Sequence, residues 1–216
     1  MSGIVADGIQ IEVPGWPSTS WLDEPALRLK LPEDGAARRT RPRSIGLHTT
    51  RGTMPQPLIS EPAADKDCTA RATVRAWRIE KRQAGAHLLV DADGEILCVA
   101  DVVREMSYHT PRLNTVSIGI EVVQRRKDGA LFEPQLRATV ALVRLLCGLF
   151  LIEQRVIWPM PRAPLPAVQM QQYSGVFGHR DVDANRGKGD PGELLPQALL
   201  QAGFRADDGQ LFVGFG

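Results

Sequence analysis

The sequence predicts an α/β or α+β domain built on a central mixed β-sheet that is flanked by helices. Short apolar runs of strand length alternate along the chain with stretches whose apolar residues recur at helical spacing. Such alternation is typical of a sheet covered by helices. The chain has 216 residues and no visible internal repeat, so we expect one domain with a short appendage.

The composition allows a core and argues against a nucleic-acid partner. Apolar residues make up 43% of the chain, which is ordinary for a globular protein. The formal net charge is only +1, so bulk electrostatic attraction does not select the partner. One local basic run is interpreted as a solvated connector, and its members are Arg38, Arg39, Arg41 and Arg43.

The three cysteines, Cys68, Cys98 and Cys147, are odd in number and show no Cys-x-x-Cys spacing. They therefore predict neither a disulfide framework nor a zinc site made of cysteines. Cys147 falls in an apolar helical run, where we interpret it as a small buried hydrophobic residue.

We find no export or membrane segment in the sequence. Residues 1–13 lack the basic region of a secretory signal. The most apolar stretch, residues 138–152, contains Arg144 and is too short to span a bilayer. We therefore expect a soluble monomer that does not insert into membranes and is cytoplasmic on synthesis.

Residues 1–40 are rich in proline, glycine and charge, and we predict that they form an N-terminal arm packed on the main domain, residues 41–216. Apolar and polar residues alternate from Ile9 to Val13, which predicts one short strand. Trp16 and Trp21 are predicted to anchor the arm.

The first half of the main domain is predicted to hold a buried strand that ends at His48, a loop, a helix and a hairpin. The segment Asp91-Ala92-Asp93-Gly94 is a good hairpin turn. The predicted ranges are 45–48 for the strand, 49–67 for the loop, 68–83 for the helix, and 87–90 and 95–99 for the hairpin strands.

The second half contains the clearest helix, predicted from Glu133 to Gln154. Pro134 suits a first helical turn, and apolar residues repeat at helical spacing up to Phe150. Its apolar stripe needs a large partner surface, so we expect it on the sheet face opposite the functional residues. The other predicted elements are strands at 117–123 and 176–177, an extended proline-rich loop at 158–168 and a helix at 194–202.

Two of the four histidines end predicted strands, where an α/β scaffold places functional groups. These are His48 and His179, and His179 also opens a polar, glycine-rich loop that reaches Asp190. Such a loop can fold back so that both of its ends face one point. Two imidazoles and one carboxylate are a common make-up of a catalytic zinc site, and the same set also suits an iron(II) oxygenase.

Four segments in this order resemble motifs of the N-acetylmuramoyl-L-alanine amidase type 2 family, which includes AmpD-like amidases, T7-lysozyme-type endolysins and peptidoglycan recognition proteins. They are Ser44-Ile45-Gly46-Leu47-His48-Thr49-Thr50, Ala86-His87-Leu88-Leu89-Val90-Asp91-Ala92-Asp93-Gly94, Ser117-Ile118-Gly119-Ile120-Glu121, and Gly178-His179-Arg180-Asp181 followed by Lys188-Gly189-Asp190-Pro191-Gly192. The resemblance spans roughly residues 43–203. It implies the fold of that family and a zinc-dependent amidase that cleaves the bond between the lactyl group of N-acetylmuramic acid and L-alanine in peptidoglycan or muropeptides.

The resemblance also implies the zinc ligands and a catalytic cation. His48, His179 and Asp190 match the three ligands. Lys188 matches a lysine placed two residues before the last ligand, whose ammonium would stabilise the oxyanion of the tetrahedral intermediate. The loop from His179 to Lys188 is one residue longer than in AmpD-like members, which leaves its local shape open.

Glu121 matches the glutamate that acts as general base in AmpD-like members. Strand alternation supports this role, because Glu121 shares a face with Ser117 and Gly119. We expect these two small residues to leave room beside the carboxylate, as a substrate-facing floor requires. The alternative is that Glu121 lies on a solvated face of the sheet.

His109 matches a histidine that lines the cleft in many relatives, so we expect it to contact substrate or a zinc ligand but not zinc itself. Asn114 would help to shape the same wall, and His87 is interpreted as structural. Some relatives have a tyrosine in the loop after the first ligand. This chain has only Tyr108 and Tyr173, neither of which lies there.

Three alternatives stay open. The chain could be a non-catalytic peptidoglycan-binding module of the same fold, although such members tend to lose a zinc ligand and this chain keeps all three. His179-Arg180-Asp181 fits the His-x-Asp pair of iron(II) oxygenases, but the long helix argues against their all-β barrel. An amidase could be a phage-type lysin, released to the cell wall through a separate pore, or a recycling enzyme for soluble muropeptides.

Overall fold

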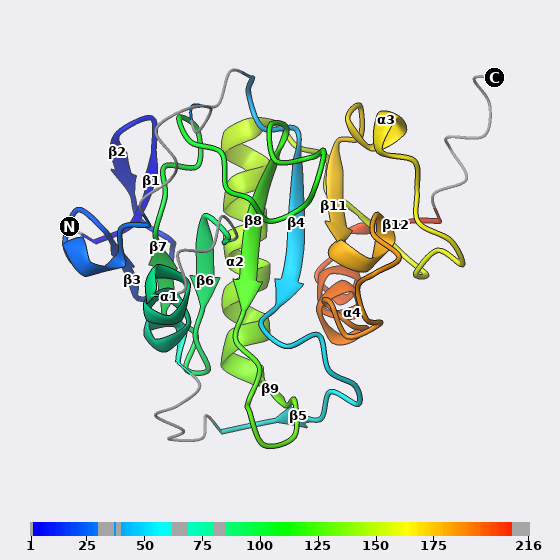
Figure 1. The fold of residues 1–216 in the computed structure, drawn as a ribbon, viewed down its shortest axis with the longest axis horizontal. Helices are drawn as coiled ribbons and strands as arrows, with labels where there is room; N and C mark the ends of the chain where they lie inside the picture. Colours follow the sequence, from blue (N-terminus) through cyan, green and yellow to red (C-terminus); the bar gives the residue numbers. More distant parts are fainter. Residues whose placement is uncertain (1, 30–36, 38–39, 62–68, 80–84, 209–216) are drawn as a thin grey trace.

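A central eight-stranded mixed sheet organises the molecule in the computed structural model, which describes residues 2–29, 37, 40–61, 69–79 and 85–208 (Figure 1). This confirms the predicted fold class. The strands are β3 (Ser18–Ser20), β4 (Ser44–Thr49), β6 (Leu88–Val90), β7 (Ile96–Cys98), β8 (Ser117–Val122), β10 (Arg155–Ile157), β11 (Gly175–Gly178) and β12 (Arg205–Asp207).

The order of strands across this sheet is β12-β10-β11-β4-β8-β6-β7-β3. Neighbouring strands are parallel, except that β6 and β7 form an antiparallel hairpin. The predicted turn closes this hairpin, with Gly94 at a positive φ of 88° and its N–H donating to the carbonyl of Asp91 at 2.9 Å. Glycine tolerates such a φ at no steric cost.

Strands β4 and β8 lie at the centre of the sheet, and their register sets the position of the functional residues. All six residues of β4 are buried, and the strand runs through His48 to Thr49, one residue beyond the predicted end. The parallel register places His48 beside Glu121. Side chains at paired positions of neighbouring strands point to the same face of a sheet, so these two share one face.

The longest helix, α2 (Glu133–Phe150), lies behind β4 and β8 (Figure 1). Its buried residues, among them Leu142 and Val143, join the same core cluster as Ile118 and Ile120 of β8. These β8 residues alternate with Glu121, so α2 covers the opposite face from His48 and Glu121, as predicted.

The predicted end of this helix is wrong. The chain leaves the helix at Leu151, which adopts a left-handed conformation with φ of 55° and donates its N–H to the carbonyl of Cys147. Glycine is the usual residue at such an ending. Because leucine gives no such signal, the sequence did not mark the turn into β10.

The opposite face of the sheet carries α1 (Ala70–Ile79). Its residues Ala70 and Val74 pack on Leu89, Leu97 and Val123 in a second core cluster. The remaining helices are α3 (Ala167–Met170) and α4 (Leu194–Gln201), with short 3-10 turns η1 (Pro25–Leu27) and η2 (His179–Asp181). No helix within the described ranges is both long and apolar enough to cross a lipid bilayer.

Segments of the N-terminal region pack into the core of the main sheet. Strand β3 pairs in parallel with β7 at the edge of the sheet. The preceding hairpin contributes Ile4 and Val5, both fully buried in the largest core cluster, while Trp16 and Trp21 pack against the core from its margin. This hairpin consists of β1 (Ile4–Ala6) and β2 (Ile9–Ile11), and a second small pair joins β5 (Leu58–Ile59) to β9 (Leu131–Phe132).

The cysteines that the structure describes are free thiols. Cys98 and Cys147 are both buried, as predicted for Cys147. Several sequence predictions lie outside the described residues, namely those on Arg38, Arg39 and Cys68 and on residues 80–83 at the end of the predicted helix.

Candidate metal centre and catalytic cleft

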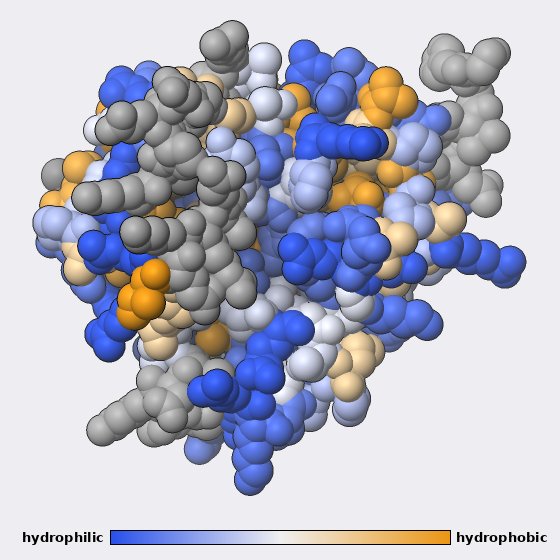
Figure 2. Space-filling model, in the orientation of Figure 1, coloured by the Kyte–Doolittle hydropathy of each residue, from blue (hydrophilic) through white to orange (hydrophobic). Residues whose placement is uncertain are grey.

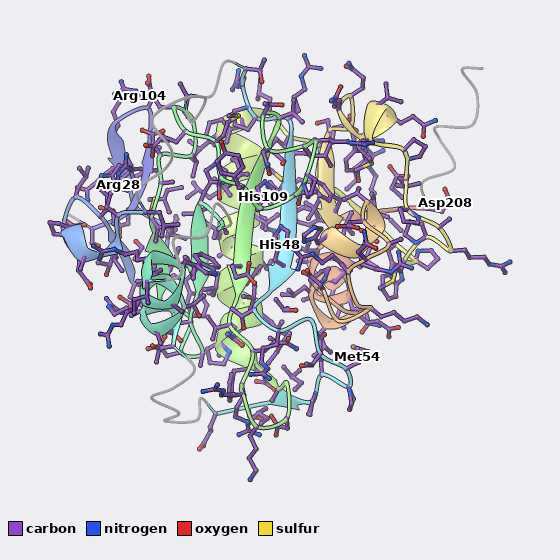
Figure 3. The ribbon with its side chains drawn as sticks, in the orientation of Figure 1. Arg28, His48, Met54, Arg104, His109 and Asp208 are labelled. Atoms are coloured by element: carbon purple, nitrogen blue, oxygen red, sulfur yellow. The ribbon has the colours of Figure 1, made fainter. Side chains whose placement is uncertain are left out.

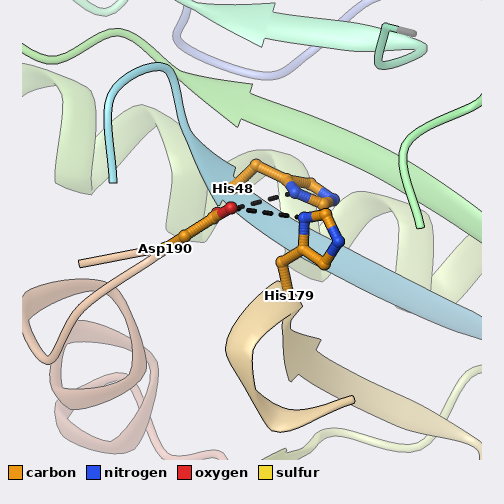
Figure 4. A group of neighbouring side chains, drawn as sticks. All are labelled: His48, His179 and Asp190. Atoms are coloured by element: carbon orange, nitrogen blue, oxygen red, sulfur yellow. Dashed lines mark ion pairs between the residues drawn. The ribbon is translucent and has the colours of Figure 1, made fainter. Parts of the chain in front are cut away.

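Three side chains that could hold a metal ion meet from three separate segments of the chain (Figure 4). His48 is the penultimate residue of β4, His179 opens the turn after β11, and Asp190 closes the loop that follows. One potential ligand atom of each residue lies within 4.8 Å of the others, and all three residues are buried. The structure therefore brings together the residues that the sequence singles out as ligands.

Both histidines present the same ring nitrogen to the carboxylate. Nδ1 of His48 lies 3.6 Å from Oδ1 of Asp190, and Nδ1 of His179 lies 3.2 Å from Oδ2 of Asp190. On its far side, the buried Nε2 of His179 faces Asp183 at 3.7 Å. Two imidazoles and one carboxylate that converge in this way fit a divalent metal ion such as zinc.

The electrostatics favour the protonation states that bind metal. Burial lowers the pKa of His48, against the opposing effect of Asp190, so the neutral imidazole is favoured. Burial alone would raise the pKa of Asp190, but hydrogen bonds and charges from His179 and His48 outweigh it and lower that pKa. A neutral imidazole and an ionised carboxylate are the forms that ligate a metal.

The loop that carries Asp190 is held against the segment after β4. The backbone N–H of Thr49 donates to Oδ1 of Asp190 at 3.2 Å, and Nε2 of Gln56 donates to the carbonyl of Gly189 at 2.8 Å. A Cβ atom at Gly189 would lie 2.5 Å from the carbonyl carbon of Gly52. Only glycine permits this approach of the two backbones, and the approach places Asp190 beside the histidines.

A cleft of about 250 Å³ opens over these residues. Its walls include Trp77 of α1, Tyr108, Glu121 of β8 and Arg186 of the loop before Asp190. The middle of the face drawn in Figure 2 is mostly hydrophilic. Such a polar cleft suits a substrate rich in hydrogen-bonding groups.

Glu121 lines the cleft and is partly exposed there. It therefore does not lie on an open, solvated face of the sheet, which was the alternative. Burial raises its pKa well above the ordinary glutamate value, and the negative charge of Asp190 adds to that increase. The positive charge of Arg186 opposes the increase. These effects are typical of a carboxyl group set up for proton transfer.

His109 lies behind His48, with its Nδ1 atom 3.0 Å from Nε2 of His48 (Figure 3). Its ring fills the space over Gly119, where a Cβ atom would lie 2.5 Å from Cγ of His109. Nε2 of His109 lies 2.9 Å from the hydroxyl of Ser117. The small residues of β8 therefore accommodate His109 and not a substrate, which corrects the expected substrate-facing floor.

His87 is a structural residue, in agreement with its interpretation from the sequence. It is fully buried, and its Nδ1 accepts a hydrogen bond from the backbone N–H of Gly119 at 3.0 Å. Its other ring nitrogen lies 3.1 Å from the carbonyl of Glu105. The ring thus fastens β8 to the segment that leads to His109.

Comparison with known proteins assigns the family. The model of the N-acetylmuramoyl-L-alanine amidase family matches residues 38–193, which is most of the chain. The chain belongs to this amidase family. The matched range includes His48, Glu121, His179 and Asp190. No curated protein sequence matches the chain.

Solved structures of similar fold include members from animals, bacteria and a phage. Drosophila peptidoglycan recognition protein SD is 16% identical and superposes with a TM-score of 0.53 over 89% of this chain and 98% of its own. The Staphylococcus aureus hydrolase AmiA, solved with its ligand, is also 16% identical, with a TM-score of 0.53 over 90% and 88%. The Ph2119 endolysin from a Thermus scotoductus bacteriophage is 17% identical, with a TM-score of 0.50 over 87% and 99%. These likenesses show the amidase fold.

Arg186 and Lys188 are two cations of the loop between His179 and Asp190, and Arg51 after β4 also lines the cleft. Lys188 is exposed and is absent from the described residues that line the cleft, so its predicted role stays a prediction. Arg186 does line the cleft, and its charge acts on both Glu121 and His48. The sequence analysis missed Arg186, although the longer loop was a signal that its side chains are placed differently.

The remaining predicted residues lie around His109. Asn114 does not line the cleft, but its side-chain oxygen accepts a hydrogen bond from the backbone N–H of Thr110 at 2.8 Å. Tyr108 lines the cleft, whereas Tyr173 is buried in a separate core cluster. Tyr108 is therefore the tyrosine that faces the cleft among the described residues.

Proposed function

We propose that this chain is a zinc-dependent N-acetylmuramoyl-L-alanine amidase that hydrolyses the amide bond between the lactyl group and L-alanine in peptidoglycan or muropeptides. The buried group of His48, His179 and Asp190 beside Glu121, in a chain of this family, supports the proposal most strongly. An amide is a poor electrophile with a poor leaving group, so its hydrolysis needs an activated nucleophile, a stabilised oxyanion and a proton donor.

His48, His179 and Asp190 would hold the zinc ion. Their convergence and burial suit a metal ligand set, and so do the neutral imidazole of His48 and the ionised carboxylate of Asp190. When bound, zinc would polarise the amide carbonyl and lower the pKa of a water molecule to about 7.

Glu121 would act as general base and then as general acid. It lines the cleft that the metal-binding side chains share, so it can accept the proton of the attacking water. Its raised pKa makes the protonated carboxyl group a ready donor to the departing amine of L-alanine. One carboxyl group thus serves both proton transfers.

A cation from the loop before Asp190 would stabilise the oxyanion. The family resemblance assigns this role to Lys188, and we keep it as the first hypothesis. Arg186 lies in the cleft and acts on the charge of Glu121, so we propose that it supports the ionised base. His109 lines the cleft, as expected, and its contact with His48 favours a role in holding that ring, whereas Asn114 contacts the Thr110 backbone and does not line the cleft.

The proposal is tested by assaying purified protein on intact sacculi and on soluble anhydro-muropeptides, with release of free L-alanine amino groups as the readout. We expect activity that a chelator abolishes and zinc restores, together with one zinc per chain. Activity on sacculi would assign a lysin, and activity on soluble muropeptides alone a recycling enzyme. Full activity without zinc, or in His48→Ala, would refute the proposed metal chemistry.

The alternative is a peptidoglycan-binding module of the same fold that does not cleave. Retention of all three ligand residues together with Glu121 argues for catalysis. The two functions are separated by measuring binding and cleavage on the same muropeptide. Tight binding with no cleavage in zinc-loaded protein would establish the binding module.

A further inference from the structure

A chain of buried hydrogen bonds runs backwards from His48 into the protein. Nε2 of His48 lies 3.0 Å from Nδ1 of His109, and Nε2 of His109 lies 2.9 Å from the hydroxyl of Ser117. That hydroxyl donates to the backbone carbonyl of Leu113 at 2.7 Å. All four residues are buried. We call His48, His109, Ser117 and the Leu113 carbonyl the histidine relay.

The hydroxyl of Ser117 sets the direction of the histidine relay, because it donates to the Leu113 carbonyl, which also accepts the backbone N–H groups of Val116 and Ser117. A carbonyl oxygen can only accept, so the single hydroxyl proton of Ser117 goes to Leu113. A Ser117 oxygen that donates its proton in this way accepts the proton on Nε2 of His109. A neutral imidazole has one protonated nitrogen, so Nδ1 of His109 is an acceptor, and His48 donates to it from Nε2.

Thr110 also contacts the histidine relay without changing this direction. Its hydroxyl lies 3.0 Å from Nδ1 of His109 and 3.5 Å from Nε2 of His48. A hydroxyl that donates to His109 again requires Nδ1 to be an acceptor. The same hydroxyl can accept from His48. Both contacts therefore agree with a proton on Nε2 of His48.

Two glycines hold the ring of His109 between the central strands. A Cβ atom at Gly46 of β4 would lie 2.9 Å from Cε1 of His109, and one at Gly119 of β8 would lie 2.5 Å from its Cγ. The backbones of both strands thus come close to the ring. A side chain confined in this way keeps its two nitrogens directed at His48 and Ser117.

We propose that His109 and Ser117 are positioning residues that fix the tautomer of His48. With the proton on Nε2, the unprotonated Nδ1 of His48 faces Asp190 and is free to bind a metal ion. Hydrogen bonds behind a ligating histidine fix its tautomer and orientation in this manner. The inference rests on the proposed metal centre but does not depend on amidase activity.

Metal affinity gives the first test, with Ser117→Ala as the variant and Ser44→Ala as its matched control. Ser44 is equally buried and pairs with Ser117 in the strand register, but its hydroxyl has no hydrogen-bond partner among the described residues. Zinc affinity is measured by competition with a chromophoric chelator. We expect Ser117→Ala to bind zinc about 10-fold more weakly, since loss of such partners typically costs 10- to 100-fold, and Ser44→Ala to bind as the wild type does.

The tautomers are read directly from long-range proton–nitrogen NMR spectra of the histidine rings in the metal-free protein. We expect His109 to carry its proton on Nε2 in the wild type and to lose this preference in Ser117→Ala, whereas the tautomer of His48, which the facing Asp190 carboxylate biases in the absence of zinc, is read from zinc-loaded protein. His109→Gln keeps an acceptor for His48 and should retain more zinc affinity than His109→Leu. Thermal unfolding confirms that each variant is folded.

A proton on Nδ1 of His109 in the wild type would overturn the proposal, as would equal zinc affinities of Ser117→Ala and Ser44→Ala. These readouts are independent of catalysis. A protein whose zinc affinity depends on Ser117 but that cleaves no muropeptide would refute the proposed function and leave this inference intact. An active amidase whose zinc affinity is the same with and without the Ser117 hydroxyl would support the proposed function and refute this inference.

Discussion

Glu121 is held in an environment that disfavours its charge, yet a general base must be ionised to accept a proton. Burial and the charge of Asp190 raise its pKa, and Arg186 lowers it. The Glu121→Gln variant keeps the size of the side chain but cannot accept a proton. We expect turnover to fall by about 100- to 10,000-fold, the usual contribution of a general base, while zinc stays bound. Turnover near the wild-type value with one zinc per chain would mean that another group is the base.

Removal of the charge at Arg186 should shift the pH dependence of the reaction. Arg186 stabilises ionised Glu121, so Arg186→Gln leaves the carboxylate less stable and raises its pKa. The base is active above its pKa, so the acidic limb of kcat/KM should move to higher pH. Profiles of the wild type and Arg186→Gln, fitted over the same range, check this. A limb that stays in place or moves to lower pH would contradict it.

Replacement of Lys188 should affect the reaction differently from replacement of Arg186. If its ammonium stabilises the tetrahedral intermediate, Lys188→Ala should lower kcat by about 100- to 1,000-fold with little change in KM. The position of the acidic limb should not change, because Arg186 and not Lys188 is the cation that acts on Glu121. Steady-state kinetics at saturating substrate measure the effect. A loss of only a few-fold would remove Lys188 from the mechanism.

The ligand residues could be predicted because His48 and His179 end strands in the sequence itself, and the loop to Asp190 is short and rich in glycine. The position of the His109 ring between β4 and β8 could not be predicted from the sequence. Its contact with Ser117, Gly46 and Gly119 depends on which strands are neighbours and in what register, and neither is encoded locally. For the same reason, the sequence wrongly predicted that Gly119 forms part of a substrate-facing floor.

At the scale of elements, segments with a clear periodicity or turn signal were predictable, among them the three-residue strand β2, and strands without such a signal were not. Helix α2 and the hairpin of β6 and β7 follow from periodicity and turn chemistry. Strands such as β1, β10 and β12 have three residues each, too few to show alternation, and they form because the neighbouring backbone offers hydrogen bonds. Packing of the chain, not local preference, creates them.

The close contact between β8 and His109 gives a prediction at this scale. In Gly119→Ala the added Cβ meets the imidazole ring at 2.5 Å, so His109 or the strand must move. We expect unfolding free energy to fall by about 1–3 kcal/mol, the usual cost of overpacking, and zinc affinity to fall with it. Denaturant unfolding and chelator competition measure the two effects.

Gly148→Ala is the matched control for this variant. Gly148 lies within α2, and no atom of the part of the chain that the structure describes lies within 4 Å of the position that its Cβ would occupy. Alanine is the better helix former by about 1 kcal/mol, so this variant should be as stable as the wild type or more stable. If the two variants behaved alike, the contact with His109 would not be the cause.

At the scale of the whole molecule, the relation of residues 1–40 to the amidase domain decides whether the chain unfolds as one unit. We propose that this arm packs on residues 41–216 as an integral part of the fold. Supporting observations are the pairing of β3 with β7 and the burial of Ile4 in the core cluster that also holds the residues of α2. An element that shares a core with the rest of a domain normally unfolds together with it.

The Ile4→Ala variant tests whether the arm and the amidase domain unfold together, with Ile9→Ala as control. Ile4 is fully buried, whereas Ile9 lies in the same hairpin with 65% of its surface exposed. We expect Ile4→Ala to lower the unfolding free energy by about 2–5 kcal/mol, the usual range for a buried isoleucine, and Ile9→Ala to change it by less than about 0.5 kcal/mol. The loss should appear in a single transition by both tryptophan fluorescence, to which Trp16 and Trp21 of the arm and Trp77 and Trp158 of the main domain contribute, and circular dichroism. Two separate transitions, of which only one moves in Ile4→Ala, would show that the arm folds independently of the central sheet.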